Sequence, residues 1–257
     1  MHVRVRLFAI QRQMAGAREV PLELADGATV EDAWIAIVGL FPALAPGRPS
    51  LRFACNGDYA EPTTALADGD EVAFIPPVSG GSGAVSADGP EPRLILELHG
   101  EPFPATILAD LEARLATDED GAVVAFVGRT RVSPGTPAPG QEAEAARHAG
   151  RAVEALEYEA HDSMAIKILA TIADEIAERF GVERLAIVHR IGAVPLGEAS
   201  IVVVAVAAHR DAAFRAARYA IDETKARAPI WKAEQFSDGQ VWIGAPARSG
   251  PEHPGSD

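Results

Sequence analysis

The segment SGGSGAVSADGPEP (residues 79–92) divides the chain and decides its fold. It is rich in Gly, Ser, Ala and Pro and has no apolar periodicity, which is typical of a flexible linker. We therefore expect one domain at 1–81, a linker at 82–92 and a second domain at 93–246. The last residues, 247–257, are predicted to be a disordered tail. A chain of 257 residues has the length for two domains of this size.

The residues before this segment predict a small α+β domain. Alternating apolar and basic residues at 3–9 and the stretch 18–24 predict two strands. Thr29 has the position of an N-cap with capping-box spacing, so a helix is expected to begin there. Strands are predicted again at 51–58, which closes in an Asn-Gly turn, and at 72–75. The predicted order is ββαββ.

The residues after the linker predict a larger α+β domain. Residues 121–131 read as a buried strand, and 132–150 as a long mobile loop. A strongly amphipathic helix is expected to end at Gly181. The other predicted elements are strands at 93–100, 152–160, 184–192 and 199–210, helices at 104–116 and 211–227, and a hairpin over 230–244.

Composition excludes several classes of function. The formal net charge of −14 argues against nucleic acid or an anionic membrane as the main partner. No apolar run approaches the roughly 18 residues of a membrane span, and the first residues do not resemble a signal peptide. Cys55 is the single cysteine, which excludes an internal disulfide and a Cys-rich zinc site. A cytoplasmic protein without a bound metal is expected.

The segment DETKARAPIWKAE (222–234) holds two of the three lysines of the chain, Lys225 and Lys232. They lie on either side of an Ala-Pro pair that stops a helix. A lysine amine, unlike a guanidinium, can lose its proton when it is desolvated or placed beside other cations. Two catalytic lysines are one interpretation; two neighbouring surface lysines are the other.

Further basic residues stand at the ends of predicted strands. Arg129 and Arg131 follow one strand, and His209 and Arg210 follow another, just before a helix that Asp211 is expected to cap. Cations gathered in this way would form an anion pocket on an acidic protein. A solvated strand end for the arginines and a buried structural role for His209 are the alternatives.

Three other features carry weaker signals. The pair His189-Arg190 precedes a Gly turn and is interpreted as structural, and residues 157–159 as strand surface. Gly80-Gly81 follows a strand and two prolines. An arm of five such residues would reach about 15 Å into a narrow channel. The alternative is that these glycines only begin the linker.

Taken together, these motifs resemble molybdopterin synthase. The stretch LADGDEVAFIPPVSGG (66–81) makes residues 1–81 similar to the small subunit, a ubiquitin-like β-grasp sulfur carrier. Residues 93–244 resemble the large, catalytic subunit, through the motifs DGAVVAFVGRTR (120–131), VHRIG (188–192), AHRDAAF (208–214) and KARAPIWKAE (225–234).

The resemblance implies a reaction and its partners. Gly81 would carry a thiocarboxylate, made by a separate adenylating and sulfur-transferring activating enzyme. The sulfur would pass to cyclic pyranopterin monophosphate and form the dithiolene of molybdopterin, with no other cofactor. The large subunit implies a homodimer through the catalytic domain. Implied roles are catalysis for Lys225, Lys232 and Gly81, and substrate binding for Arg129, Arg131, His209, Arg210, Lys225, Lys232, Ala233 and Glu234.

Two features depart from the family. The loop after Arg131 is longer than expected, and Ser82 follows Gly81, so the carboxyl group that must be activated is in a peptide bond. Cleavage between Gly81 and Ser82 would resolve this. The alternatives are a catalytic domain served by a separately encoded carrier, with its own carrier domain inactive, and a non-catalytic sulfur-carrier scaffold.

Overall fold

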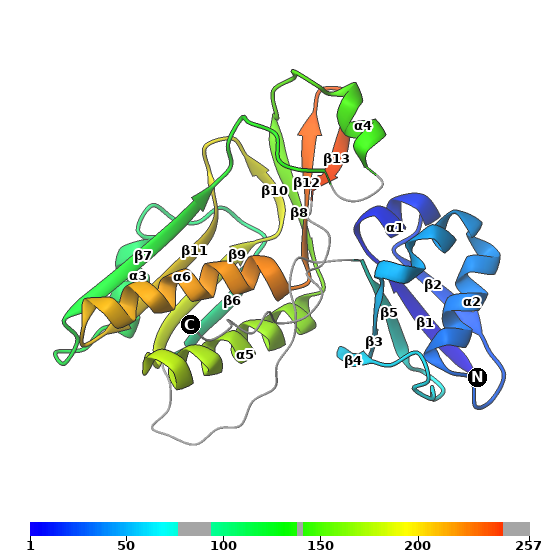
Figure 1. The fold of residues 1–257 in the computed structure, drawn as a ribbon, viewed down its shortest axis with the longest axis horizontal. Coiled ribbons are helices and arrows are strands. Elements are labelled where there is room, and N and C mark those ends of the chain that lie inside the picture. The colour runs from blue at the N-terminus through cyan, green and yellow to red at the C-terminus, as the bar shows by residue number, and fades with distance from the viewer. Residues whose placement is uncertain (77–93, 138–140, 244–257) are drawn as a thin grey trace, which may run out of the picture.

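The computed structural model describes residues 1–76, 94–137 and 141–243. The predicted linker, Gly81 and the predicted disordered tail all lie outside these residues. Two α+β domains face each other in Figure 1, and α2 lies on the far side of the first domain from the second. None of the helices in the described part of the chain combines the length and apolar character of a membrane-spanning segment.

The first domain, called the carrier domain below, is one five-stranded sheet with its own core. The strand order is β2-β1-β5-β3-β4, and the central pair β1 and β5 is parallel. Helix α2 covers one face through Trp34 and Ile37, and Thr29 caps it in a capping box with Asp32, as predicted. A sheet with a separate core is typical of a domain that folds on its own.

Three elements of the carrier domain were not predicted: helix α1, the 3-10 segment η1 and the short strand β4. The strands are β1 (His2–Leu7), β2 (Glu19–Glu23), β3 (Arg52–Cys55), β4 (Asp58–Ala60) and β5 (Glu71–Ile75). The helices are α1 (Ala9–Ala15), α2 (Val30–Leu40) and the 3-10 segment η1 (Pro42–Ser50).

The second domain, called the catalytic domain below, has two four-stranded sheets. One has the order β6-β9-β11-β7 and is covered by α5 and α6 on one face and α3 on the other. The other has the order β10-β8-β12-β13 and is antiparallel throughout. Its strands β12 and β13 form the predicted closing hairpin.

The bounds in the catalytic domain follow. The strands are β6 (Leu94–His99), β7 (Ala122–Arg129), β8 (Ala155–Ala160), β9 (Arg184–Arg190), β10 (Gly192–Pro195), β11 (Ala199–Ala207), β12 (Ile230–Phe236) and β13 (Gly239–Ile243). The helices are α3 (Ile107–Leu115), α4 (Glu142–Arg147), α5 (Asp162–Phe180) and α6 (Arg210–Arg227).

Four local predictions can be compared with this structure. Helix α5 ends at Gly181 with a left-handed φ of 64°, as expected. The strand predicted as buried is β7, an edge strand that is partly exposed. The predicted mobile loop 132–150 contains α4 in its described part. Asp211 does not cap α6, because the N-cap is His209 without a side-chain bond, and Asp211 pairs with Arg215 in the first turn.

Candidate active site

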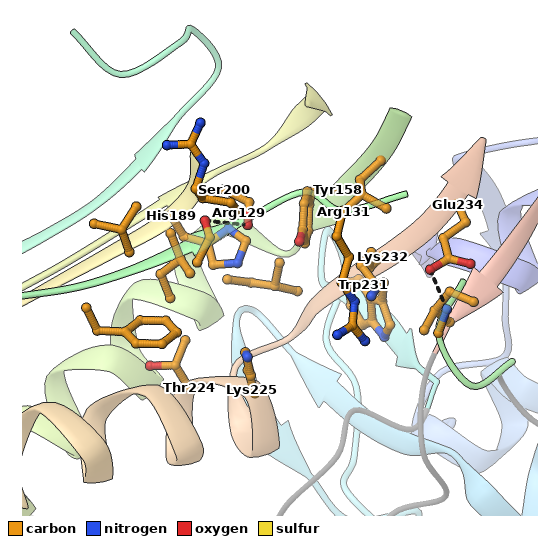
Figure 2. Close-up of a pocket in the computed structure, with 18 of the residues that line it drawn as sticks. Arg129, Arg131, Tyr158, His189, Ser200, Thr224, Lys225, Trp231, Lys232 and Glu234 are labelled. Atoms are coloured by element: carbon orange, nitrogen blue, oxygen red, sulfur yellow. Dashed lines mark hydrogen bonds between the residues drawn. The ribbon is translucent and has the colours of Figure 1, made fainter. Parts of the chain in front are cut away.

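A cavity of about 540 Å³ lies between the two sheets of the catalytic domain. Its walls come from β7, β8, β9, β11 and β12 and from the last turn of α6. Figure 2 shows the charged groups of this cavity, which include the predicted cations Arg129, Arg131, Lys225 and Lys232. The structure therefore brings four of the predicted cations together at one place on an acidic protein.

Lys225 enters the cavity from the last turn of α6, which ends at Arg227 just before the Ala-Pro pair. Its Nζ lies 5.8 Å from the centre of the Phe126 ring. In Figure 2 the amine points up into the cavity, toward the side lined by His189. An amine placed at the cavity floor is in a position to act as a nucleophile or proton carrier.

The last turn of α6 is fixed by a buried ion pair. Arg227 is 4% exposed, and its Nη1 donates to Glu175 of α5 at 2.6 Å and to Glu223 at 3.3 Å. The Tyr219 hydroxyl donates to the same Glu175 oxygen at 2.8 Å. Removing one member of such a pair would leave an uncompensated buried charge, so the contact holds the turn that carries Lys225 in place.

Lys232 reaches the cavity from β12 and is half-buried. Burial lowers the pKa of its amine, and the positive charges of Lys225 and Arg131 lower it further, while Glu234 acts in the opposite direction. The pKa depression that the sequence predicted for a lysine among cations is therefore found at Lys232.

Arg129 and Arg131 line the exposed edge of the cavity. Both are exposed, and the Arg129 guanidinium donates to the carbonyl oxygen of Gly197. In Figure 2 the side chain of Arg131 extends toward Lys232. A planar guanidinium and a nearby ammonium are the groups that proteins use for phosphate.

The wall beside Lys225 is polar but uncharged, and it contains residues that sequence reasoning missed. His189 was interpreted as structural and Tyr158 as strand surface, yet both line the cavity together with Ser200. The His189 and Tyr158 rings meet edge to face at 4.9 Å. Burial raises the pKa of Tyr158, so its hydroxyl stays protonated.

His189 is held in one neutral form. Its Nδ1 lies 2.7 Å from the carbonyl oxygen of Arg190, which can only accept, so Nδ1 carries the proton and Nε2 has the lone pair. Burial lowers the pKa of this imidazole to about 4, and the Lys225 charge adds to the effect. The cavity thus combines a cationic side with a neutral hydrogen-bonding side.

Glu234 and Ala233 occupy opposite faces of β12. Glu234 is 3% exposed, lines the cavity and accepts the Gly135 N–H at 2.7 Å, which ties the loop after β7 to this strand. A Cβ at Gly135 would lie 3.0 Å from Ile243, so only glycine fits there without displacement. Ala233 is fully buried on the other face and does not line the cavity.

His209 and Arg210 are not part of this cavity. They begin α6, whereas Lys225 lies in its last turn, so about 24 Å of helix separates them. Within the single chain described they do not meet the lysines, and their predicted role in substrate binding stays a prediction. The candidate residue Gly81 falls outside the described residues.

The carrier domain docks on the face of the β12 sheet that points away from the cavity. Side chains alternate along a strand, so Lys232 and Glu234 face the cavity while Trp231 and Ala233 pack against the carrier domain. Trp231 touches both, because it also borders the cavity. Ile75, at the end of β5, belongs to the same apolar cluster as Trp231.

Polar contacts surround this cluster. The buried carboxylate of Glu159 accepts the Ala9 N–H at 3.0 Å and pairs with Arg12 at 3.2 Å, and the Trp242 indole donates to Gln13 at 3.1 Å. Residues 157–159 are therefore not strand surface alone, since Glu159 is 8% exposed.

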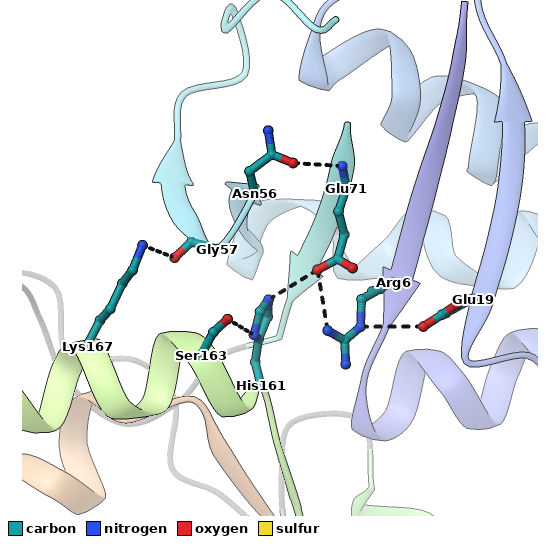
Figure 3. A network of polar contacts seen from close by, with 8 residues as sticks. All are labelled: Arg6, Glu19, Asn56, Gly57, Glu71, His161, Ser163 and Lys167. Carbon is teal, nitrogen blue, oxygen red and sulfur yellow. Dashed lines mark hydrogen bonds and ion pairs between the residues drawn. The ribbon is translucent and has the colours of Figure 1, made fainter. Parts of the chain in front are cut away.

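A second group of polar contacts lies beside α5 and is drawn in Figure 3. Lys167 binds Asp58 and the Gly57 carbonyl, and His161 lies 4.0 Å from Glu71, which also pairs with Arg6. Burial lowers the pKa of His161 and Arg6 lowers it further, whereas the carboxylates of Glu71 and Asp162 raise it.

Comparisons with known proteins match the two domains separately. A family model described as MoaE protein matches residues 102–227, and one described as ThiS family matches residues 5–81. The molybdopterin synthase structure from Staphylococcus aureus is 32% identical, with a TM-score of 0.48, and covers 62% of this chain and 100% of that chain.

Two relatives are named molybdopterin synthase catalytic subunit. The one from Oryza sativa is 45% identical over 122 residues, 48% of this chain and 56% of that protein. The one from Bacillus subtilis is 39% identical over 126 residues, 49% of this chain and 71% of that protein. The chain thus spans just over half the length of the rice relative. It belongs to the molybdopterin synthase catalytic subunit (MoaE protein) family and carries a ThiS-family β-grasp domain at its N-terminal side.

Proposed function

We propose that the chain is a molybdopterin synthase, a sulfurtransferase of molybdenum cofactor biosynthesis. It passes sulfur from a thiocarboxylate on Gly81 to cyclic pyranopterin monophosphate and so forms the dithiolene. The observation that carries this proposal is how the carrier domain docks. The end of β5 packs against Trp231, and Trp231 also borders the cavity that Lys225 and Lys232 line. The five residues from 77 to 81 would span about 15 Å when extended, which is enough to enter a cavity at that place.

The cavity supplies groups for each part of this chemistry. Arg129 and Arg131 bind the phosphate, and Glu234 positions the loop that follows Arg131. Lys225 is the principal catalytic amine and Lys232 assists it, because its lowered pKa leaves a share of neutral amine for proton transfer. His209 and Arg210 serve the substrate of a neighbouring chain in a homodimer, since they lie far from the lysines of their own chain.

Each sulfur transfer balances without a redox partner. The thiocarboxylate sulfur forms a bond to a substrate carbon while a C–O bond at that carbon breaks and its oxygen leaves with the bonding electrons, to be protonated or to remain on the phosphate. Water then attacks the acyl carbon and breaks the acyl C–S bond, which leaves the sulfur on the substrate. The carrier leaves with an ordinary carboxylate on Gly81, and the activating enzyme must restore the thiocarboxylate before the next transfer. Two transfers give the dithiolene, and no further cofactor takes part.

The sequence at Gly81 requires one covalent change first. Because Ser82 follows it, the chain must be cut between these two residues before the carboxyl group can be activated. Exposed Gly/Ser-rich segments are preferred sites for proteolysis. Intact-mass analysis of the protein from its native host tests this step directly. An uncut chain that makes molybdopterin with no other carrier present would overturn it.

The activity itself is tested by reconstitution. The cut protein, loaded with thiocarboxylate at Gly81, is mixed with cyclic pyranopterin monophosphate, and molybdopterin is measured together with the return of Gly81 to a carboxylate by mass spectrometry. We expect two thiocarboxylates to be consumed per dithiolene. A loaded carrier that supports synthesis only with an added catalytic subunit would identify the chain as a scaffold. Synthesis only with an added carrier would show its own carrier domain to be inactive.

A further inference from the structure

The carrier domain docks on a surface formed by Glu159, His161, Met164, Trp231 and Trp242, called the docking face below. We propose that this face binds one carrier at a time. In the uncut chain the fused carrier domain occupies the face and thereby prevents separately supplied carriers from binding. The partner that fits the face is thus a second copy of the same carrier domain. The consequence for sulfur transfer rests on the proposed function, whereas the occupancy of the face does not.

The first support is that the carrier domain uses both oxygens of Glu159. One accepts the Ala9 N–H and the other forms an ion pair with Arg12, so both oxygens face the fused carrier domain. Ala9 has a φ of 48°, in the left-handed region that residues other than glycine rarely adopt. Its N–H therefore meets Glu159 in a conformation that the docked contact helps to maintain.

The second support is an aromatic slot. Phe8 is fully buried between His161 and Trp231, with ring centres 5.2 Å and 5.0 Å apart. A competing carrier would have to place its own Phe8 in the same slot. Two rings cannot share that volume, so the two carriers exclude each other.

The third support comes from close packing beside α5. A Cβ on Gly57 would lie 3.2 Å from the Ser163 hydroxyl oxygen, and the Lys167 amine donates to the carbonyl oxygen of Gly57. The contact therefore extends from α1 to the turn between β3 and β4. A separate carrier cannot take part of the face while the fused domain keeps the rest.

Tethering decides the outcome of the competition. A short flexible linker gives a fused domain an effective concentration in the millimolar range. A separate carrier of equal intrinsic affinity, with a Kd in the micromolar range, would then bind on the order of 10²–10³-fold more weakly than it binds an open face. Cutting after Gly81 removes this advantage and leaves only the affinity of the contacts themselves.

The test uses the full chain with Gly81→Val, which blocks cleavage, and residues 1–81 as the separate carrier. Arg12→Glu with Gln13→Ala is introduced only into the fused carrier domain, so the contacts of the separate carrier stay intact. The double substitution places a second carboxylate against Glu159 and removes the acceptor of the Trp242 indole. We expect titration calorimetry to show that the separate carrier binds at least 10-fold more tightly to this variant than to the Gly81→Val chain.

Two controls complete the experiment. Leu40→Ala removes an exposed apolar side chain from α2, on the other side of the carrier domain, and should leave the affinity unchanged. Adding Trp231→Ala to the variant with Arg12→Glu and Gln13→Ala should abolish the gain in affinity for the separate carrier, because it damages the docking face for both carriers. Equal binding of the separate carrier to that double variant and to the Gly81→Val chain would overturn the proposal. Tighter binding without sulfur transfer from a thiocarboxylated separate carrier would refute the proposed function but not the competition.

Discussion

Replacing Lys225 should separate catalysis from folding. The side chain contributes a cation–π contact with Phe126 and a positive charge in the last turn of α6. The first is worth about 0.5–1 kcal/mol at an exposed site and the second about 0.3–1 kcal/mol. Lys225→Ala should therefore cost about 1–2 kcal/mol of unfolding free energy, which lowers the melting temperature by roughly 2–8 °C in a protein of this size.

The effect on turnover should be much larger. Losing a positioned proton-transfer group typically costs about 10²–10⁴-fold in rate. Lys225→Arg keeps the charge, the ring contact and the helix-end interaction, so its stability should stay within about 0.5 kcal/mol of the parent protein. Its activity should nevertheless fall almost as far as in Lys225→Ala, because a guanidinium does not give up its proton.

The assay is single-turnover formation of molybdopterin by the thiocarboxylate-loaded protein, with thermal unfolding of each variant measured alongside. Binding of cyclic pyranopterin monophosphate, measured separately, should weaken less in the arginine variant than in the alanine variant. Near-normal turnover by Lys225→Arg would refute the reasoning, because it would show that Lys225 acts only through its charge.

Three further predictions use neighbouring groups. Lys232→Met should raise the melting temperature by roughly 2–4 °C, corresponding to about 1 kcal/mol, because it removes a desolvated charge. It should reduce turnover less than Lys225→Ala does. The stability gain should fade as the pH rises toward 10.5, the ordinary pKa of the amine, and a destabilised variant would contradict the prediction. The affinity between the domains of the cut chain, measured by calorimetry, should be highest above pH 6.5, where His161 is neutral in the separated domains as well. It should fall as the pH drops from 6.5 through the lowered pKa of His161, because docking disfavours the charged imidazole, and His161→Phe should flatten this profile. Gly135→Val should cost about 1–3 kcal/mol through its clash with Ile243 and raise the KM for substrate, and unchanged values of both would show that the loop tether has no role.

Local sequence signals predicted many of the elements because their causes are local. The capping box at Thr29, the left-handed Gly181 and the final hairpin each depend on residues close in sequence. Helix α1 has no such signal: its N-cap, Phe8, makes no side-chain cap bond, and the N–H of Ala9 is satisfied by Glu159 in the other domain. The seven residues of α1 alone cannot reveal a contact with a residue 150 positions away in the sequence.

The candidate site was predicted in part for the same reason. Lys225 and Lys232 are close in sequence and meet in one cavity because a helix end and the following strand turn toward each other. His189, which the sequence indicated to be structural, lines the cavity, whereas His209 does not. Each stands in a His-Arg pair at the end of a strand, and only the tertiary fold shows that the first faces the lysines while the second lies at the far end of α6.

The alternation of side chains along β12 ties two surfaces to one register. A shift of this strand by one residue against β8 would move Trp231 toward the cavity and Lys232 into the apolar contact with the carrier domain. Neither sulfur chemistry nor carrier docking would survive such a slip, and no compensating change on one face could restore the other. An insertion or deletion of a single residue between α6 and β12 should therefore be far more damaging than any point substitution there, and length in this turn should be the most tightly constrained property of the chain.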